Sequence, residues 1–529
     1  MTRPLGAQIS HMLKARGVDV IFGIPGVHNQ EMYRGIEEAG ITHVLARHEQ
    51  GAGFMADGYA RASGRAGVAY VITGPGLTNV LTPLGQAYSD SVPVLAISSC
   101  LDDVAARRGQ LHQMLDQRAA ADTVCDWSCE ARSPDAAYAL IDRAFTEFAC
   151  DRPRPKHLQV PILLLEGQAE NPPPAPARAV RPRAPDAELE AAIRAVLSAQ
   201  KPLFIFGGGA RGAADAIGPL LEMTGAAAFV TYAGRGLVAA DAPLYFGSSL
   251  ARPDSDTVLA EADLVIVAGS ELGEVDLWRD RPDIRGRMIR IDLDPEVLAQ
   301  ARAGDLAVRA DAAAFLTAMR IAIPARTEDR APCWDEARVA AARQRWRAEV
   351  DAEGPGIVPV CAALQAALPQ NMMVYSDMTT FAYAAKEVWD MPRPGHWHHP
   401  TGFGTLGYAL PAAIGGAVAR PGLPTLCIAG DYGFQYTLPE LGVAVELGLP
   451  LPILLWDNGK LGAIEDSMTR AQIAPNAVIA RNPDFLALAK AYGAATAAPR
   501  DLEALSRAVL DAFAAKGPTV IHLRTDIAL

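Results

Sequence analysis

Residues 426–460 read LCIAGDYGFQYTLPELGVAVELGLPLPILLWDNGK. The stretch opens with an apolar run, residues 426–429, and continues into the glycine-flanked turn GDYG at residues 430–433. An apolar segment with helical spacing follows, and a second apolar run, residues 451–456, ends at the dipeptide Asp-Asn. This order predicts a strand, a turn, a helix and a second strand, which together make the βαβ unit of a parallel sheet.

Polar side chains follow both of these predicted strands. Asp431 comes directly after the first strand, and Asn458 comes just after the second. Open α/β sheets bind their ligands at this carboxyl edge. Carboxylate and amide oxygens suit Mg²⁺, which takes its remaining ligands from substrate phosphates and water. The glycines of the turn allow backbone amides to approach a phosphate at the helix start.

The motif GD-x26-N formed by Asp431 and Asn458 resembles the diphosphate and metal site of thiamine-diphosphate (ThDP) enzymes. The resemblance implies that these two side chains and the main-chain oxygen of Lys460 bind Mg²⁺. It also implies three further cofactor contacts: Gly430, Tyr432 and Gly433. Taken alone, the stretch leaves open an ordinary strand–helix turn with an aspartate cap.

Length and composition bound the rest of the chain. With 529 residues, about three domains are expected. The net charge is 48 − 60 = −12, which excludes a general nucleic-acid binder. No apolar run approaches the roughly 20 residues that span a bilayer, the N-terminus shows no apolar signal core, and seven cysteines are few. A cytoplasmic location with neither membrane nor nucleic-acid partners is expected.

The expected fold class is α/β, with three doubly wound parallel-sheet domains. The expected boundaries are an N-terminal pyrimidine-binding domain at 1–166, a proline-rich linker at 167–186, a central domain at 187–325, a connector at 326–356 and a diphosphate-binding domain at 357–529.

A second strong resemblance lies at residues 47–61, RHEQGAGFMADGYAR. The segment looks very like its counterpart in acetolactate-synthase-type ThDP enzymes. The resemblance implies that Glu49 hydrogen-bonds N1′ of the cofactor aminopyrimidine and favours the imino tautomer, which takes the proton from the thiazolium C2. A buried glutamate paired with Arg47 or His48 as a structural contact is the alternative.

Three loops complete the N-terminal half of the expected site. The loops of GIPGVHN at 23–29 and VITGPGLTN at 71–79 line the pyrimidine in the family, and GQLHQMLDQ at 109–117 aligns with a catalytic-pocket segment. The implied cofactor contacts are Pro25, Gly26, Thr73 and Asn79. Gln113 matches a catalytic glutamine, whereas His112 and His28 are candidates for proton transfer and substrate binding. A loop histidine with only a local partner is equally compatible with each of these two positions.

The middle of the chain carries GGGARG at 207–212 after an apolar run. This literal GxGxxG lacks an acidic residue at the end of a following strand, so a nicotinamide site is not expected. Acetolactate synthases often bind structural FAD in this domain and carry an RFDDR-type segment, whereas this chain has GSELGEVDLW at 269–278. FAD is therefore not expected.

The last third supplies the remaining candidates. Thr379 and Thr380 stand at a helix start, where they could hold phosphate oxygens or simply cap the helix. TGFGTLGYALPAAIGG at 401–416 resembles the family segment in which Leu406 supports the bent cofactor and the Gly404 carbonyl accepts from its 4′-amino group. Glu465 is the nearest match to a catalytic pocket glutamate of the family's decarboxylases.

Together these motifs look closest to the 5-guanidino-2-oxopentanoate decarboxylase branch of the family. The resemblance implies ThDP- and Mg²⁺-dependent decarboxylation of a 2-oxo acid through a C2 carbanion and an enamine. A guanidinium tail would need a carboxylate, which Asp116, Glu465 or Asp466 could supply. The family also implies a homodimer or homotetramer with active sites at subunit interfaces.

Two other functions stay open. One is an acetolactate-synthase-like carboligase that joins two 2-oxo acids, although Ser467 stands near the position of the tryptophan found in biosynthetic enzymes. The other is an inactive ThDP-binding regulatory subunit, which is disfavoured because Glu49, Asp431 and Asn458 are all present.

Overall fold

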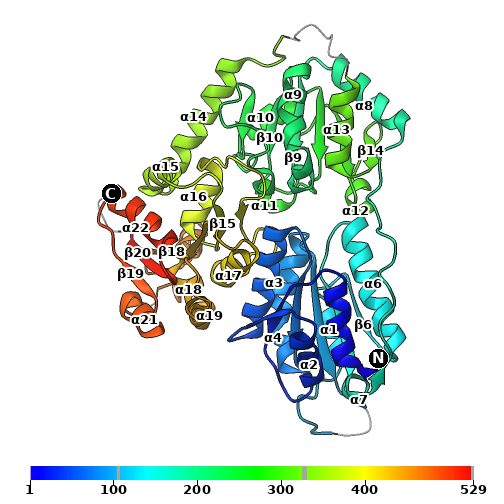
Figure 1. Ribbon diagram of the computed structural model, residues 1–529. Helices are drawn as coiled ribbons and strands as arrows, with labels where there is room; N and C mark the ends of the chain where they lie inside the picture. The colour runs from blue at the N-terminus through cyan, green and yellow to red at the C-terminus, as the bar shows by residue number, and fades with distance from the viewer. Residues whose placement is uncertain (1, 104–107, 324–330, 480, 526–529) are drawn as a thin grey trace. The chain divides into compact units, whose positions relative to one another are not determined.

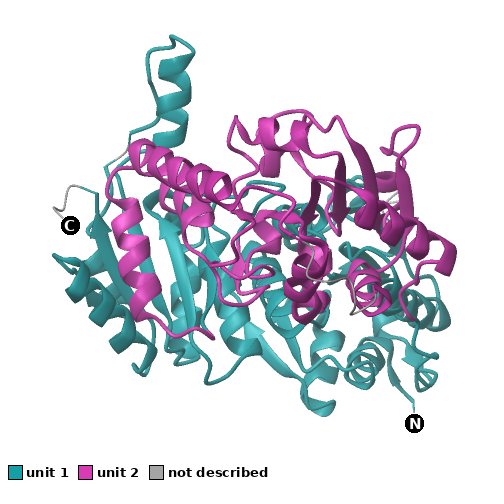
Figure 2. Cartoon of the chain, turned by 90° about the horizontal axis from the view of Figure 1, so that it is seen from above, with its two compact units in different colours: residues 1–179, 372–379, 399–528 teal, residues 180–371, 380–398, 529 magenta. Residues whose placement is uncertain are grey.

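The chain divides into two compact units (Figure 2), which are described separately. Unit 1 comprises residues 1–179, 372–379 and 399–528, and unit 2 comprises 180–371, 380–398 and 529. The structure is a computed structural model, and it describes residues 2–103, 108–323, 331–479 and 481–525. The expected boundary between 325 and 326 therefore lies outside the described residues, and the other expected boundaries stay predictions.

The first sheet of unit 1 is parallel, with the strand order β3-β2-β4-β5-β7-β6. Its strands are β2 (Val20–Gly23), β3 (Thr42–Leu45), β4 (Gly67–Val71), β5 (Val94–Cys100), β6 (Trp127–Glu130) and β7 (Lys156–Pro161). The helices of this half are α1 (Leu5–Ala15), α2 (Gln30–Glu38), α3 (Glu49–Ser63), α4 (Pro75–Ser89), α5 (Gln117–Asp122), α6 (Pro134–Cys150) and α7 (Ile162–Glu166). Helices α1, α2 and α7 lie against one another (Figure 1). A short antiparallel pair joins β1 (Arg3–Pro4) to β8 (Gln168–Ala169).

The second sheet of unit 1 has the parallel order β15-β17-β18-β20-β19. Its strands are β15 (Met373–Ser376), β17 (Thr425–Gly430), β18 (Pro452–Asp457), β19 (Ala495–Ala497) and β20 (Thr519–Arg524). The helices are α17 (Ala409–Ala419), α18 (Asp431–Tyr436), η3 (Leu438–Glu440), α19 (Leu441–Glu446), α20 (Gly462–Arg470), α21 (Phe485–Tyr492) and α22 (Leu502–Phe513). Parallel strands buried on both faces read as continuous apolar runs, which is why the sequence revealed β17 and β18.

Unit 2 contains a third parallel sheet, with the order β11-β10-β9-β12-β13-β14. Its strands are β9 (Pro202–Phe206), β10 (Ala227–Val230), β11 (Tyr245–Gly247), β12 (Leu264–Ala268), β13 (Arg287–Asp292) and β14 (Leu306–Arg309), and unit 2 also holds β16 (Trp397–His398). The helices are α8 (Asp186–Ser198), η1 (Gly208–Ala213), α9 (Ala214–Thr224), η2 (Tyr232–Gly234), α10 (Ser255–Glu261), α11 (Glu274–Leu277), α12 (Pro295–Leu298), α13 (Ala312–Ala322), α14 (Glu336–Glu353), α15 (Ile357–Ala367) and α16 (Thr380–Val388). The expected α/β class with three parallel sheets is thereby confirmed.

The glycine-rich turn of unit 2 has a packing role. A Cβ on Gly207 would lie 2.2 Å from the carbonyl oxygen of Gly269, so only glycine fits between the ends of β9 and β12. Residues 170–185, within the predicted linker, form neither helix nor strand. Among the described residues, no helix is long and apolar enough to cross a membrane.

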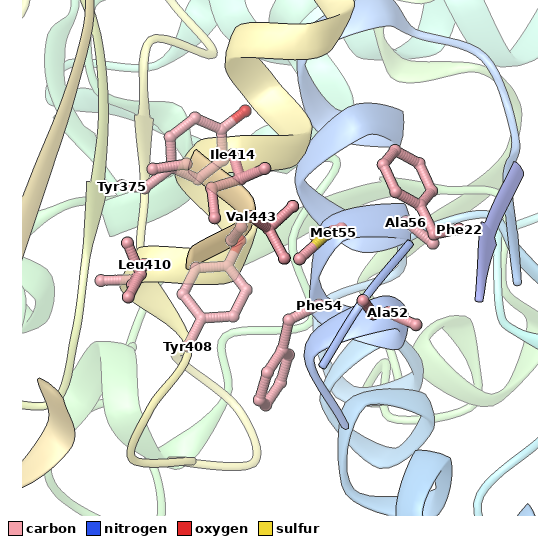
Figure 3. Packing of buried hydrophobic residues seen from close by; sticks show 14 of the residues in the cluster. Phe22, Ala52, Phe54, Met55, Ala56, Tyr375, Tyr408, Leu410, Ile414 and Val443 are labelled. Carbon is pink, nitrogen blue, oxygen red and sulfur yellow. The ribbon is translucent and has the colours of Figure 1, made fainter. Parts of the chain in front are cut away.

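The two halves of unit 1 share one core, in which α3 packs against α17. A Cβ on Gly58 would lie 2.0 Å from the Ala412 carbonyl oxygen, and one on Gly415 would lie 1.9 Å from that of Met55. Glycine at these positions lets the two helix backbones touch. Figure 3 shows the apolar side chains that surround this contact. The small residues of α3 therefore serve close packing within the unit.

Candidate active site

Glu49 is the first residue of α3 and follows β3 after a short loop. His48 caps the helix, with its Nδ1 accepting from Gln50 N at 3.1 Å. The Glu49 side chain is buried, and its Oε2 accepts from Asn79 Nδ2 at 2.9 Å. A Cβ on Gly76 would lie 3.3 Å from Oε1. The structure thus brings Glu49 and Asn79 together, and a carboxylate at this helix N-terminus is electrostatically favourable.

Glu440 is a buried carboxylate that the sequence did not single out. It accepts from the backbone amides of His48 at 2.9 Å and of Arg47 at 3.2 Å. Burial raises its pKa to about 7. A Cβ on Gly51 would lie 2.2 Å from Oε1, so glycine is required there. Glu440 therefore holds in place the segment that carries Glu49, and its signal in the sequence was an acid inside a mostly apolar helical segment.

The loop from Thr73 to Gly76 is fixed by buried polar contacts. Thr73 Oγ1 donates to Ser99 Oγ at 2.8 Å, and Gly74 N donates to Gln117 Oε1 at 2.8 Å. Gly74 has φ +72°, a conformation that favours glycine. The predicted cofactor contact Thr73 is buried in this network, which fixes the turn that leads into α4, the helix that carries Asn79.

His28 and His112 lie edge to face, with ring centroids 5.0 Å apart and an interplanar angle of 69°. Within the described residues, the buried Nδ1 of each ring has no hydrogen-bond partner. Burial, with the nearby His112, lowers the pKa of His28. His112 has φ +63°, an unusual backbone for a residue with a side chain. The Oε1 of neighbouring Gln113 accepts from Gln110 N at 3.3 Å.

The loop before α2 brings two more predicted contacts near this histidine pair. Gly26 N donates to Asn29 Oδ1 at 2.8 Å, which closes the turn. Pro25 precedes it and is exposed. A Cβ on Gly26 would lie 2.1 Å from the side chain of Ile72, so this loop packs directly on the strand that leads to Thr73.

The metal half of the site lies at the carboxyl ends of β17 and β18, where Gly430 pairs with Trp456. Asp431 is buried, and its Oδ2 accepts from Asn482 Nδ2 at 2.7 Å. The same amide donates to Asp457 Oδ1 at 2.9 Å. Burial raises the pKa of Asp431, and the charge of Asp457 adds to that effect. Two neighbouring carboxylates bridged by one amide make an oxygen-rich site that a cation would stabilise.

The other two predicted metal ligands lie beyond β18. Asn458 Oδ1 accepts from Lys460 N at 3.2 Å, and Lys460 pairs with Ile479 as an isolated bridge. Among the described residues, no group of three His, Cys, Asp or Glu could hold a metal. The set of Asp431, Asn458 and a carbonyl oxygen suits Mg²⁺, because that ion takes few protein ligands.

Asp377 organises the loop that carries Gly404 and Leu406. Its carboxylate accepts from Gly407 N at 2.9 Å and from Met378 N at 2.8 Å, and burial raises its pKa to about 6. A Cβ on Gly433 would lie 2.5 Å from Asp377 Oδ2. Gly404 has φ +67°. Asp377 thus couples this loop to the Gly430–Gly433 turn, another role that the sequence did not reveal.

The predicted threonines fall in different units. Thr379 lies in unit 1, where its Cβ would be 3.1 Å from a Cβ on Gly430. Thr380 opens α16 of unit 2. Tyr432 follows Asp431 in α18 and is half-buried.

The three candidate carboxylates for a guanidinium tail have different surroundings. Asp116 is the N-cap of α5, where its Oδ1 accepts from Ala119 N at 2.9 Å. Glu465 Oε2 pairs with Lys460 Nζ at 2.5 Å and is half-buried. Asp466 is exposed on the same helix, α20. Glu465 and Asp466 therefore lie next to the metal half of the site, whereas Asp116 already has a structural role.

Glu49 and the loop that carries Gly404 and Leu406 contact different parts of α4. Asn79, the partner of Glu49, lies in the first turns of this helix. The loop residue Gly402 packs against Ser89, and Thr405 Oγ1 donates to Gln86 Oε1, both at the other end. Ten residues of helix separate Asn79 from Ser89, which is roughly 15 Å along the axis.

Comparison with known proteins matches three segments of the chain to one family. The "Thiamine pyrophosphate enzyme, N-terminal TPP binding domain" matches residues 3–120, the central domain of the same enzymes matches 189–319, and their C-terminal TPP binding domain matches 377–523.

Curated relatives span nearly the full length. A protein of Pseudomonas aeruginosa named "Probable 2-ketoarginine decarboxylase AruI" is 44% identical over 532 residues, which covers 99% of this chain and 94% of the relative. The acetolactate synthase isozyme 2 large subunit of Escherichia coli K12 is 30% identical over 538 residues, with 98% and 95% coverage. The chain therefore belongs to the thiamine pyrophosphate (ThDP) enzyme family, as the motifs around Glu49 and Asp431 predicted.

Proposed function

We propose that this protein is a ThDP- and Mg²⁺-dependent decarboxylase of a 2-oxo acid, and that its substrate is 5-guanidino-2-oxopentanoate (2-ketoarginine). The observation that carries the proposal is the 44% identity, over 99% of the chain, to a probable 2-ketoarginine decarboxylase. Identity to the acetolactate synthase large subunit of Escherichia coli is 30%. The carboligase alternative is therefore not favoured.

The residues at the two sheet edges fit the cofactor and its metal. Asp431, Asn458 and the Lys460 carbonyl would hold Mg²⁺, and backbone amides of the 430–433 turn at the start of α18 would contact a diphosphate. Bound ThDP supplies a nucleophilic carbon and accepts electrons as CO₂ leaves. Glu49 would donate to and accept a proton from the pyrimidine N1′, and Asn79 fixes the orientation of its carboxylate.

We propose that the pair of His28 and His112 transfers the proton that is needed to form the product. The two imidazoles lie 5.0 Å apart, and burial together with the neighbouring His112 lowers the pKa of His28, which favours its neutral form. The unpartnered Nδ1 atoms of His28 and His112 leave a ring nitrogen on each residue for substrate or proton transfer. Gln113, next in sequence, would orient the substrate carbonyl.

We propose that α20 recognises the guanidinium tail. Its carboxylates Glu465 and Asp466 follow Lys460 closely in sequence and carry two negative charges beside one lysine. A guanidinium can bind a carboxylate through two parallel hydrogen bonds, which an ammonium cannot do. The tail would therefore compete with Lys460 for Glu465.

A second copy of the chain is proposed to complete each active site. Within one chain, Glu49 contacts the first turns of α4 through Asn79, whereas the Gly404–Leu406 loop contacts the helix further along, at Gln86, and this separation supports sites that combine two copies. Large apolar side chains are exposed around both halves: Val27, Leu111, Leu115, Ile464, Ile473 and Ile479. Such exposure is typical of an interface. A homodimer is the minimum, and a homotetramer is compatible with it.

Two further expectations stay proposals. All seven cysteines are free, which supports a cytoplasmic location. The expectation that FAD is not bound stays a prediction.

The decisive experiment is a substrate screen. Purified protein with Mg²⁺ and ThDP is incubated separately with pyruvate and with 5-guanidino-2-oxopentanoate, and the products are identified by mass spectrometry. CO₂ and the guanidino aldehyde are expected from the second acid. Acetolactate from pyruvate, with no aldehyde from the guanidino acid, would identify a carboligase instead.

A further inference from the structure

Unit 2 contains two buried cations without a carboxylate partner. Arg235 is 4% exposed and Lys386 is 3% exposed. The Arg235 Nη1 donates to the Ala385 carbonyl at 3.4 Å, whereas its Nε and Nη2 have no partner within the described residues. Lys386 Nζ lies over the ring of Tyr232, 3.9 Å from the centroid. No ion pair links either cation to a carboxylate in the part of the chain that the structure describes.

Arg252 in the same unit shows what a satisfied buried cation looks like. It is 6% exposed and binds Glu387 through two hydrogen bonds, at 2.6 and 3.0 Å, and Glu353 at 2.8 Å. Burial alone would lower the pKa of Arg252, but its carboxylate partners raise that pKa well above its ordinary value. Burial instead lowers the pKa of Arg235 to about 10 and that of Lys386 to about 8. The two unpaired cations are therefore costly to bury, and the fold nevertheless keeps them.

The two cations are close to each other. Arg235 contacts the carbonyl of Ala385, the residue before Lys386, and its charge contributes to the lowered pKa of Lys386. Tyr232 belongs to the same cluster: its ring faces Lys386, and its buried hydroxyl has no partner within the described residues. The guanidinium Nε and Nη2 and the phenol hydroxyl thus have no acceptor within the described residues, and the Lys386 ammonium beside them is influenced by the charges of Glu387 and Asp276. Buried polar groups in native proteins are almost always paired, by an ion or a ligand if not by the protein.

We propose that Arg235, Lys386 and Tyr232 form a binding site for a phosphate group in unit 2, separate from the ThDP site. A tetrahedral oxyanion can accept two N–H groups from the planar guanidinium and further hydrogen bonds from the ammonium and the phenol. The exposed ring of Trp278, 6.0 Å from Lys386 Nζ, marks the side from which solvent reaches the cluster. The ligand is either free phosphate or a small phosphate ester.

The experiment titrates inorganic phosphate into protein saturated with Mg²⁺ and ThDP, so that the diphosphate site is filled, and measures heat by calorimetry. Wild type is expected to take up one phosphate per chain. Arg235→Gln and Lys386→Met should weaken binding by about tenfold or more, which is the effect of one charge-assisted hydrogen bond. Glycerol phosphate in a parallel titration separates the sources: tighter binding identifies an ester, and equal binding identifies free phosphate.

Lys201→Met is the matched control. Lys201 lies in the same unit with its ammonium over the Trp334 ring, at 5.4 Å, but it already pairs with Glu261 at 3.2 Å. This variant should bind phosphate like wild type. A wild type that takes up no phosphate, or a Lys386→Met protein that binds it equally well, would overturn the proposal.

Thermal unfolding gives a second readout that does not depend on weak heats. In phosphate-free buffer, Lys386→Met should unfold at a higher temperature than wild type, because it removes an unpaired buried charge. Added phosphate should raise the unfolding temperature of wild type and so reduce its difference from that of Lys386→Met. If Lys386→Met instead unfolds at the lower temperature in phosphate-free buffer, Lys386 is satisfied within the protein and there is no phosphate site.

Discussion

The two halves of the candidate active site repeat one arrangement with different surroundings. In each, an acid opens a helix and accepts from an asparagine amide: Glu49 from Asn79 at 2.9 Å, and Asp431 from Asn482 at 2.7 Å. The Asn482 amide also bridges to Asp457, so the second half concentrates negative charge. Glu49 has a second carboxylate nearby, Glu440, but that one accepts from backbone amides. Under the proposed function, the same local design would serve proton exchange in one half and cation binding in the other.

The largest expected effect comes from Glu49→Gln. The amide keeps the shape of the side chain but cannot exchange a proton with the pyrimidine, so turnover should fall by about 10²–10⁴-fold. Cofactor affinity, measured by calorimetry, should change little, because the metal half is untouched. Glu446→Gln, which alters an exposed acid that pairs with Arg47, serves as control. Near-normal turnover in Glu49→Gln would show that the Glu49 carboxylate does not exchange the proton.

The role of Glu440 predicts how stability depends on pH. Its pKa is raised to about 7 in the folded protein, so the folded state binds more protons than the unfolded chain above the ordinary glutamate value. The bound proton therefore adds to the free energy of unfolding. This stabilisation is complete at low pH, is lost as the pH rises toward 7, and amounts to at most about 3 kcal/mol. In Glu440→Gln, the free energy of unfolding should no longer show this part of the dependence on pH.

The measurement is denaturant unfolding of wild type and Glu440→Gln between pH 5 and pH 8, with the difference between the two curves reported. Taking the difference cancels other groups that titrate in this range, such as Asp377. Parallel curves would mean that the Glu440 carboxyl has the same pKa in both states.

Asn482→Ala tests the opposite half. Loss of the amide leaves Asp431 and Asp457 without their bridge and removes the group that orients the metal ligand. Affinity for Mg²⁺ in the presence of ThDP should fall by about 10–100-fold. Asn476→Ala, in an exposed loop, is the control. An unchanged affinity for Mg²⁺ would show that Asn482 does not contribute to the metal site.

The smallest effect comes from mixing damaged chains. If each site combines Glu49 from one copy with Asp431 from another, dimers of Glu49→Gln and Asp431→Ala chains contain one intact site. Random pairing should then restore about a quarter of wild-type activity, although each variant alone is inactive. Co-expression with two affinity tags checks this, because the purified doubly tagged dimer should then show about half of the wild-type activity. An inactive mixed dimer would place both halves of a site in one chain.

The sequence predicted the sheets and most of the site elements because their signals are local. The buried parallel strands β17 and β18 read as apolar runs, and Asp431 follows the first of them directly. Glu440 and Asp377 escaped prediction because their partners are backbone amides of distant residues, and a sequence does not display such partners. Asp116 shows that one residue can suit two roles: the sequence predicts a substrate ligand, and in the structure the side chain also caps α5.

The contact of α3 with α17 also constrains how this chain folds. The glycine-lined surface of α3 is finished once residue 63 has been made, yet its partner begins at residue 409. At 5–20 residues per second, synthesis of the intervening chain takes roughly 20–70 s. Throughout that interval the nascent chain carries Phe54 and Met55, which are fully buried in the finished protein, without the helix that covers them. The N-terminal part therefore leaves part of the final core uncovered until the C-terminal part has been synthesised, and exposed apolar surface of this kind promotes aggregation.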